Sequence, residues 1–144
     1  MQAVNVGREI HEGVNVTIRS TPSSRMTLDA NYTYLNRSIS GAPGVFPTGT
    51  PRHKTIGTAT TRLPRNITAI LSARYQSGIV AMSDNGLSLP ASKFATFDLG
   101  SIVPIRAGAT MQIGLKNLLD RNYYYWEGFP EEGRNWYLTL RYTF

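Results

Sequence analysis

In the last eleven residues of the chain, 134–144, polar and apolar side chains alternate from Asn135 to the end. Successive side chains of a β-strand point to opposite faces, so this segment predicts a strand with one apolar and one polar face. The length also suits a membrane-spanning barrel strand of roughly 9–11 residues. In water, such a terminal strand would be an exposed sheet edge that is prone to aggregation. The apolar face comprises Trp136, Leu138, Leu140, Tyr142 and Phe144.

The same alternation recurs along the whole chain, and no segment shows the period of an amphipathic helix. Apolar residues at every second position predict seven strands, of which the third is rich in threonine and the least regular. The predicted strands cover residues 14–19, 26–34, 52–63, 67–76, 93–103, 106–116 and 134–144.

The predicted connections alternate between short and long. Short turns are expected at 21–24, at 64–66 and just after Pro104, and long loops at 36–51, 77–92 and 118–133, which hold most of the Gly and Pro residues. Outer-membrane barrels combine short periplasmic turns with long extracellular loops. We therefore predict an all-β, antiparallel transmembrane β-barrel segment of about seven strands, with its last residue on the periplasmic side. Polar and apolar residues also alternate along the strands of a soluble β-sandwich, but a sandwich does not predict the alternation of short and long connections.

Composition removes several other classes of protein. The chain has 15 Lys and Arg against 9 Asp and Glu, but no two basic residues are adjacent, so no basic patch for nucleic acid is expected. Without cysteine, disulfides and thiolate metal sites are excluded. No run of about 18 apolar residues predicts a transmembrane helix, and the first ten residues lack the pattern of a secretory signal. For an outer-membrane barrel, that last point indicates a fragment.

The C-terminal third carries a distinctive motif. Residues 116–123 read Lys-Asn-Leu-Leu-Asp-Arg-Asn-Tyr, and they are followed by Gly133, Arg134 and a strand ending in Tyr-Thr-Phe. This strongly resembles the C-terminal signature of TonB-dependent outer-membrane receptors, in which Asn-Leu-Phe-Asp-Lys-x-Tyr precedes Gly-Arg and a last strand ending in Phe. Leu119 and Arg121 stand where the family usually has Phe and Lys.

Weaker matches to the same family lie upstream in the same order, at residues 12–14, 31–34, 51–54 and 97–99. The resemblance implies a barrel of roughly 22 strands with a plugged lumen. Since seven strands are too few to close such a barrel, residues 1–144 are predicted to be the C-terminal portion of a receptor β-barrel, with the plug domain and N-terminal strands absent.

The resemblance implies uptake of a ferric siderophore, cobalamin or a similar scarce ligand across the cell outer membrane of a Gram-negative bacterium. TonB would act only through the missing N-terminal region. Outer-membrane lipid and the small-molecule ligand of the full receptor are the other expected partners, and no cofactor is expected. The barrel-assembly machinery would recognise the terminal apolar face, from Trp136 to Phe144. The alternative is a self-contained small outer-membrane barrel with a structural or adhesive role, which needs an eighth strand from residues 2–10.

Two groups of side chains in the last long loop are candidates for ligand contact. The aromatic stretch suits an extracellular ligand site, although a girdle at the membrane interface combined with loop packing explains it more simply. The acidic residues suit a hard cation or a solvated loop. The aromatic candidates are Tyr124, Tyr125, Trp126 and Phe129, and the acidic ones are Glu127, Glu131 and Glu132.

No catalytic constellation is recognisable, and no enzymatic activity is predicted. The only histidines are His11 and His53, and no spacing joins His53 to Ser83 or Asp84 as a nucleophilic site requires. Four basic residues predicted to point inward would either attract anionic ligands or the plug, or pair with Asp29 and Asp98. They are Arg74, Arg106, Lys116 and Arg141.

Overall fold

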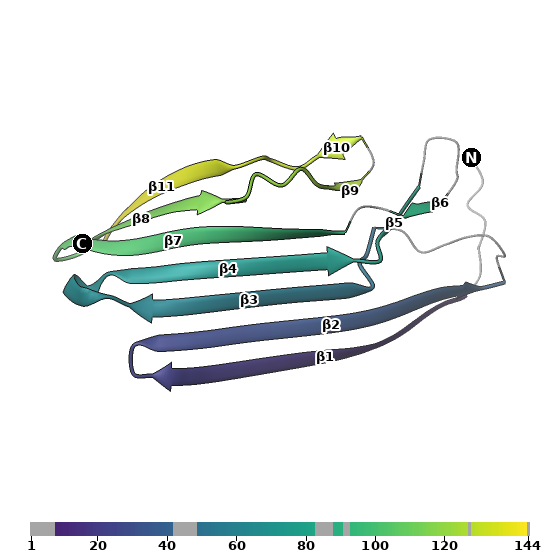
Figure 1. The fold of residues 1–144 in the computed structure, drawn as a ribbon, viewed down its shortest axis with the longest axis horizontal. Coiled ribbons are helices and arrows are strands. Elements are labelled where there is room, and N and C mark those ends of the chain that lie inside the picture. Colours follow the sequence, from purple (N-terminus) through teal and green to yellow (C-terminus); the bar gives the residue numbers. More distant parts are fainter. Residues whose placement is uncertain (1–7, 42–48, 83–87, 91–92, 127, 144) are drawn as a thin grey trace.

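The computed structural model describes residues 8–41, 49–82, 88–90, 93–126 and 128–143. They form one seven-stranded antiparallel sheet in which each strand pairs with the main-sheet strand before it in the chain (Figure 1). The predicted all-β class and number of strands are confirmed. In sheet order the strands are β1 (Arg8–Ser23), β2 (Met26–Ser40), β3 (His53–Arg62), β4 (Thr68–Ser77), β7 (Phe94–Arg106), β8 (Ala109–Lys116) and β11 (Asn135–Tyr142).

Short turns lie at one end of the sheet and long connections at the other, as the loop lengths predict. The C-terminal end of β11 lies with the short turns in Figure 1. The second and third long connections each carry a small hairpin, which the sequence pattern did not predict. These hairpins are β5 (Val80–Met82) with β6 (Ser88–Pro90), and β9 (Tyr124–Trp126) with β10 (Phe129–Pro130).

The strand register gathers the apolar side chains on one face. Val16 lies opposite Tyr32, Leu71 opposite Leu99, and Ile113 opposite Leu138. The residues between them point to the other face and are mostly polar or small, with Ile56 and Ile70 among the exceptions. Because this parity is kept from β1 to β11, the apolar face is continuous. Its large exposed side chains are Val14, Val16, Ile18, Leu28, Tyr32, Leu71, Tyr75, Leu99, Ile113, Trp136, Leu138, Leu140 and Tyr142.

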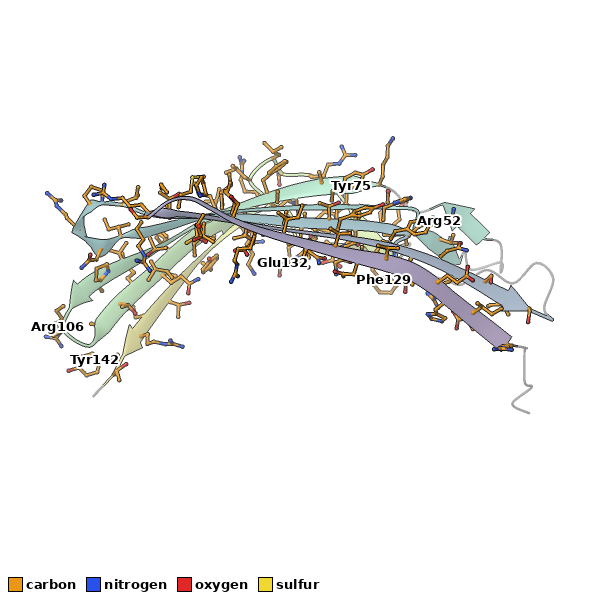
Figure 2. All side chains as sticks on the ribbon, turned by 90° about the horizontal axis from the view of Figure 1, so that it is seen from below. Arg52, Tyr75, Arg106, Phe129, Glu132 and Tyr142 are labelled. Carbon is orange, nitrogen blue, oxygen red and sulfur yellow. The ribbon has the colours of Figure 1, made fainter. Side chains whose placement is uncertain are left out.

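The main sheet is a single twisted layer, and Figure 2 shows side chains leaving it on both sides without a second sheet packed against either. Within the described ranges, the only buried apolar side chains are Ile79 and Phe94, both at the end with the long connections. A β-sandwich would bury one face of each sheet against another, so the structure is not a sandwich. None of the described segments is a helix that could span a membrane.

Two strands are longer than the pattern predicts. The sequence predicts a turn at residues 21–24, but β1 continues through Pro22 to Ser23. β1 is an edge strand, where the missing N–H of proline is tolerated, and the register shifts between Ser20 and Ser23. β2 runs to Ser40 although a loop is predicted from residue 36, and the Arg37–Glu9 ion pair of 2.6 Å links this extension to β1.

The predicted inward direction of Arg106 is wrong. The register of β7 against β8 shifts between Pro104 and Arg106, so one extra residue reverses the parity. Arg106 consequently pairs with Ala109, and its guanidinium lies 5.6 Å from the ring centre of Tyr142 on the apolar face. Figure 2 shows Arg106 and Tyr142 together at the end of the sheet.

Candidate functional site

The third long connection, residues 117–134, bounds a polar cavity of about 270 Å³ at its end of the sheet. The strands contribute polar-face residues to the cavity wall, including Arg74 and Thr96, which lie opposite one another on β4 and β7. Basic and acidic side chains both line it. The full lining is Arg74, Thr96, Asp98, Lys116, Asn117, Tyr123, Glu131, Glu132 and Asn135.

Asn117 ties the two ends of this connection together. Its backbone N–H donates to Oδ1 of Asp98 at 2.8 Å, while its side-chain Nδ2 donates to the carbonyls of Arg121 at 2.8 Å and Glu132 at 3.3 Å. Its Oδ1 accepts from the Arg121 N–H at 2.9 Å. Asn117 is only 4% exposed and has φ 50°, a left-handed conformation that asparagine tolerates better than most residues.

Asp120 makes a second tie three residues later. It also has a positive φ, and its Oδ1 accepts from the backbone N–H of Arg134 at 2.7 Å. A Cβ on Gly133 would lie 3.0 Å from the same oxygen, so glycine keeps this approach open. Together the ties bring β11 to β8 with Asn135 opposite Lys116. This geometry gives the Asn-Leu-Leu-Asp and Gly-Arg motifs a structural role.

The aromatic part of the connection packs back onto the sheet. The ring of Tyr123 lies 4.2 Å from that of Phe94, and the ring of Tyr125 lies 5.5 Å from it, edge to face. Arg74 also donates from Nη1 to the Tyr125 hydroxyl at 3.3 Å. Burial, followed by the nearby Tyr125 and Glu131, raises the pKa of Tyr123. The Tyr123 phenol therefore stays neutral and faces the cavity as a hydrogen-bonding group.

The predicted ligand-contact residues occupy different environments. Tyr125 makes the internal contacts just given, Tyr124 is half-buried, and Phe129 is 74% exposed on its hairpin. The side chain of Trp126 and all of Glu127 lie outside the described residues. Glu131 and Glu132 line the cavity, but the described part of the chain brings no three potential metal ligands together. Ligand contact by this loop stays a prediction.

Neither histidine faces the cavity. His53 lies opposite Tyr34 on the apolar-face parity, and its Nδ1 is 2.9 Å from the Tyr32 hydroxyl. His11 lies 3.2 Å from Glu9 on β1. Ser83 and Asp84, the candidate partners of His53 in a nucleophilic site, fall outside the described residues.

The sequence leaves open a pairing of the inward cations with Asp29 and Asp98, and the structure does not show this pairing among the described residues. Among the described residues, Asp29 pairs with Arg19, and Asp98 accepts the Asn117 N–H. Lys116 instead lies with Nζ 5.7 Å from the ring centre of Tyr137. Arg74 and Lys116 therefore reach the cavity with no carboxylate within ion-pairing distance in the part of the chain that the structure covers.

The terminal strand presents its predicted apolar stripe. Trp136, Leu138, Leu140 and Tyr142 share one face and are each at least 50% exposed. The end of the strand is tied to the β7–β8 turn, where Thr143 N–H donates to the Gly108 carbonyl at 2.8 Å. Phe144, the last member of the stripe, lies outside the described residues.

No protein-family model matches this sequence, and a search of curated proteins finds no match. Solved structures do match. The siderophore receptor PiuA from Acinetobacter baumannii is 18% identical with a TM-score of 0.75, covering 96% of this chain and 22% of the receptor. The ferripyoverdine receptor of the outer membrane of Pseudomonas aeruginosa is 16% identical with a TM-score of 0.74, covering 93% of this chain and 19% of the receptor.

The ferric-catecholate import receptor Fiu from E. coli K12, in its open form, is 19% identical with a TM-score of 0.75. The match covers 95% of this chain and 21% of that receptor. At these identities the likeness shows the fold, and the chain spans about a fifth of the length of each receptor. The predicted resemblance is thus confirmed at the level of fold: this sheet is similar to one part of an outer-membrane siderophore receptor.

Proposed function

We propose that this chain forms the C-terminal part of the barrel wall of a TonB-dependent outer-membrane receptor that takes up a ferric siderophore. The observation that carries the proposal is the single-layer sheet with an exposed apolar face running from β1 to β11. Its backbone follows siderophore receptors over nearly the whole chain. Ferric siderophore is preferred to cobalamin because the matching structures are described as siderophore receptors.

The apolar face supports a location in the outer membrane. Burial of apolar surface contributes roughly 25 cal/mol per Å², and no described part of the chain covers this face. Hydrocarbon would cover it without any rearrangement of the strands. The polar face would then line the lumen, where water, the plug and the ligand can satisfy its hydrogen-bonding groups.

The two edges of the sheet support a larger barrel over a self-contained one. β1 and β11 do not pair with each other in the described sheet. In lipid each unsatisfied backbone group costs several kcal/mol, so spanning sheets close. Further strands of the full receptor would pair with both edges. Loop 117–134 would face the extracellular side, and TonB would act through the N-terminal region of the full receptor.

The exposed stripe of β11 supports recognition by the barrel-assembly machinery. In this proposal Trp136, Leu138, Leu140, Tyr142 and Phe144 form the assembly signal, and the chain has no catalytic role and needs no cofactor. Ligand contact by the loop through Tyr124, Tyr125, Trp126 and Phe129 is part of the proposal. Tyr125 also accepts a hydrogen bond from Arg74, which holds the loop to the sheet.

The gene tests the proposal directly. The DNA upstream of the Met1 codon should encode further alternating strands, a plug and a signal peptide in one reading frame. A strain from which the region encoding residues 1–144 is deleted should lose uptake of iron-55-labelled siderophore under iron limitation, and the intact gene should restore it. A lone signal peptide upstream, with unchanged iron uptake in the deletion strain, would instead favour the small structural or adhesive barrel.

A further inference from the structure

A second polar cavity, of about 300 Å³, lies at the end of the sheet with the short turns. It is formed where the β1–β2 turn meets the end of β3, at the opposite end from the cavity under loop 117–134. Two arginines and five hydroxyl residues line it, among them Arg25, Arg62, Ser23, Ser24 and Thr60. No carboxylate is among these lining residues. We call it the rim cavity.

The main chain holds the two arginines of the rim cavity side by side. The backbone N–H of Arg62 donates to the carbonyl of Arg25 at 2.7 Å, which fastens the β1–β2 turn to the end of β3. The backbone N–H of Arg25 donates to Ser23 Oγ at 3.3 Å and shapes the turn itself. The proximity of Arg25 and Arg62 is therefore set by strand register and turn geometry, independently of any side-chain partner.

The rim cavity carries positive charge without a matching acid. Neither guanidinium forms an ion pair within the described ranges, and Asp29 on the adjoining part of β2 is already paired with Arg19. Both arginines are exposed. Two positive charges held close together repel one another. An anion placed between them adds two attractive interactions that offset this repulsion.

The lining chemistry selects among anions. Guanidinium groups bind carboxylate and phosphate through paired N–H donors, and hydroxyls add donors that suit an anion with more than two acceptor oxygens. A phosphate monoester carries about −1.5 to −2 charges at neutral pH, which matches two arginines. We propose that the rim cavity binds the phosphate monoester group of a soluble compound. The proposal does not depend on siderophore uptake.

Titration calorimetry with inorganic phosphate on the full chain in detergent micelles tests this site. Arg25→Gln and Arg62→Gln should each weaken phosphate binding by about tenfold or more, since each loses a charge-assisted donor. Arg65→Gln is the matched control, because Arg65 is an exposed arginine of the next short turn and does not line the cavity. An equal loss in Arg65→Gln, or equal affinity for acetate, would overturn a specific phosphate site.

A measurement on the unaltered chain removes any dependence on how the variants fold. Phenylglyoxal modifies accessible arginines, and phosphate should protect Arg25 and Arg62 but leave Arg65 reactive, as read by peptide mass spectrometry. Vesicles of phosphatidylglycerol in phosphatidylcholine, compared with phosphatidylcholine alone, test a lipid phosphodiester as the alternative ligand. Protection by inorganic phosphate would support the proposal, and protection by phosphatidylglycerol vesicles only would contradict it. Absence of protection by both contradicts the proposal.

Discussion

The two faces of this sheet share one backbone but differ in what their side chains contact. On the apolar face, residues such as Ile18 and Leu140 are more than 60% exposed, and no described segment packs over them. On the polar face, side chains bond to one another across strands. Asn31 Nδ2 donates to Asn15 Oδ1 and to Thr17 Oγ1, both at 2.8 Å, and Arg19 pairs with Asp29.

The contrast indicates where each face resides. A polar face that satisfies its own groups can line a water-filled lumen, whereas an apolar face of seven strands in water would favour aggregation. Among the described residues, the buried apolar side chains are Ile79 and Phe94, at the end with the long connections, where Tyr123 packs on Phe94. The fold is therefore explained if lipid replaces the missing second layer on the apolar face.

The largest expected effect comes from placing a charge on each face of β11. Leu138→Arg should lower the free energy of unfolding in lipid vesicles by about 2–4 kcal/mol if position 138 lies near the bilayer midplane. Thr139→Arg, one residue away on the polar face, should have a much smaller effect. Both variants can be measured by denaturant titration of the full receptor in vesicles. Equal losses would overturn the assignment of the faces.

A glycine on each face gives a smaller, steric comparison. A Cβ at Gly114, on the polar face, would lie 2.6 Å from the ring of Tyr137, whereas a Cβ at Gly57, on the apolar face, meets only the Asp29 carbonyl oxygen at 3.9 Å. Gly114→Ala should therefore cost about 1–3 kcal/mol through overpacking, and Gly57→Ala should be close to neutral. The same denaturant titration measures both. If Gly57→Ala were the costlier change, the packing described for the Tyr137 ring would be wrong.

The smallest effect should come from the polar network itself. Asn31→Ala removes the side-chain hydrogen bonds of Asn31 with Asn15, Thr17, Thr33 and the Val16 carbonyl. This loss should cost about 1 kcal/mol in unfolding free energy. Thr58→Ala is the control, because Thr58 lies on the same face opposite Asp29 and makes no side-chain hydrogen bond to another described residue. A loss of the same size in Thr58→Ala would show that the network adds no specific stability.

Period-2 patterning was sufficient to predict every strand of the main sheet, because each strand has one mainly apolar face and one mainly polar face. The pattern predicted strand ends and side-chain directions incorrectly where strand pairing determined them. Pro22 signals a turn in isolation but is accommodated in an edge strand. Arg106 changed face through an irregularity in register, which depends on pairing with β8 and cannot be read from β7 alone.

The site was less predictable than the fold. The motif around Asn117 could be recognised by resemblance, but its role as a tie depends on Asp98 and Glu132, which are brought to it only by the folded sheet. The rim cavity was not predicted, since Arg25 and Arg62 are far apart in sequence and meet through one backbone hydrogen bond. Strands β9 and β10, which form one small hairpin, are too short to show a period of their own.

The most direct test of the central claim is a scan of β11 with single cysteines. Residues 1–144 contain no cysteine, so each cysteine introduced into this part of the full receptor adds one thiol to which a fluorophore can be linked. In lipid vesicles, bromine-labelled acyl chains should quench the fluorophore at positions 136, 138, 140 and 142, and aqueous iodide should quench it at 137, 139 and 141. Iodide quenching at every position, with no effect of brominated lipid, would contradict a membrane-spanning strand.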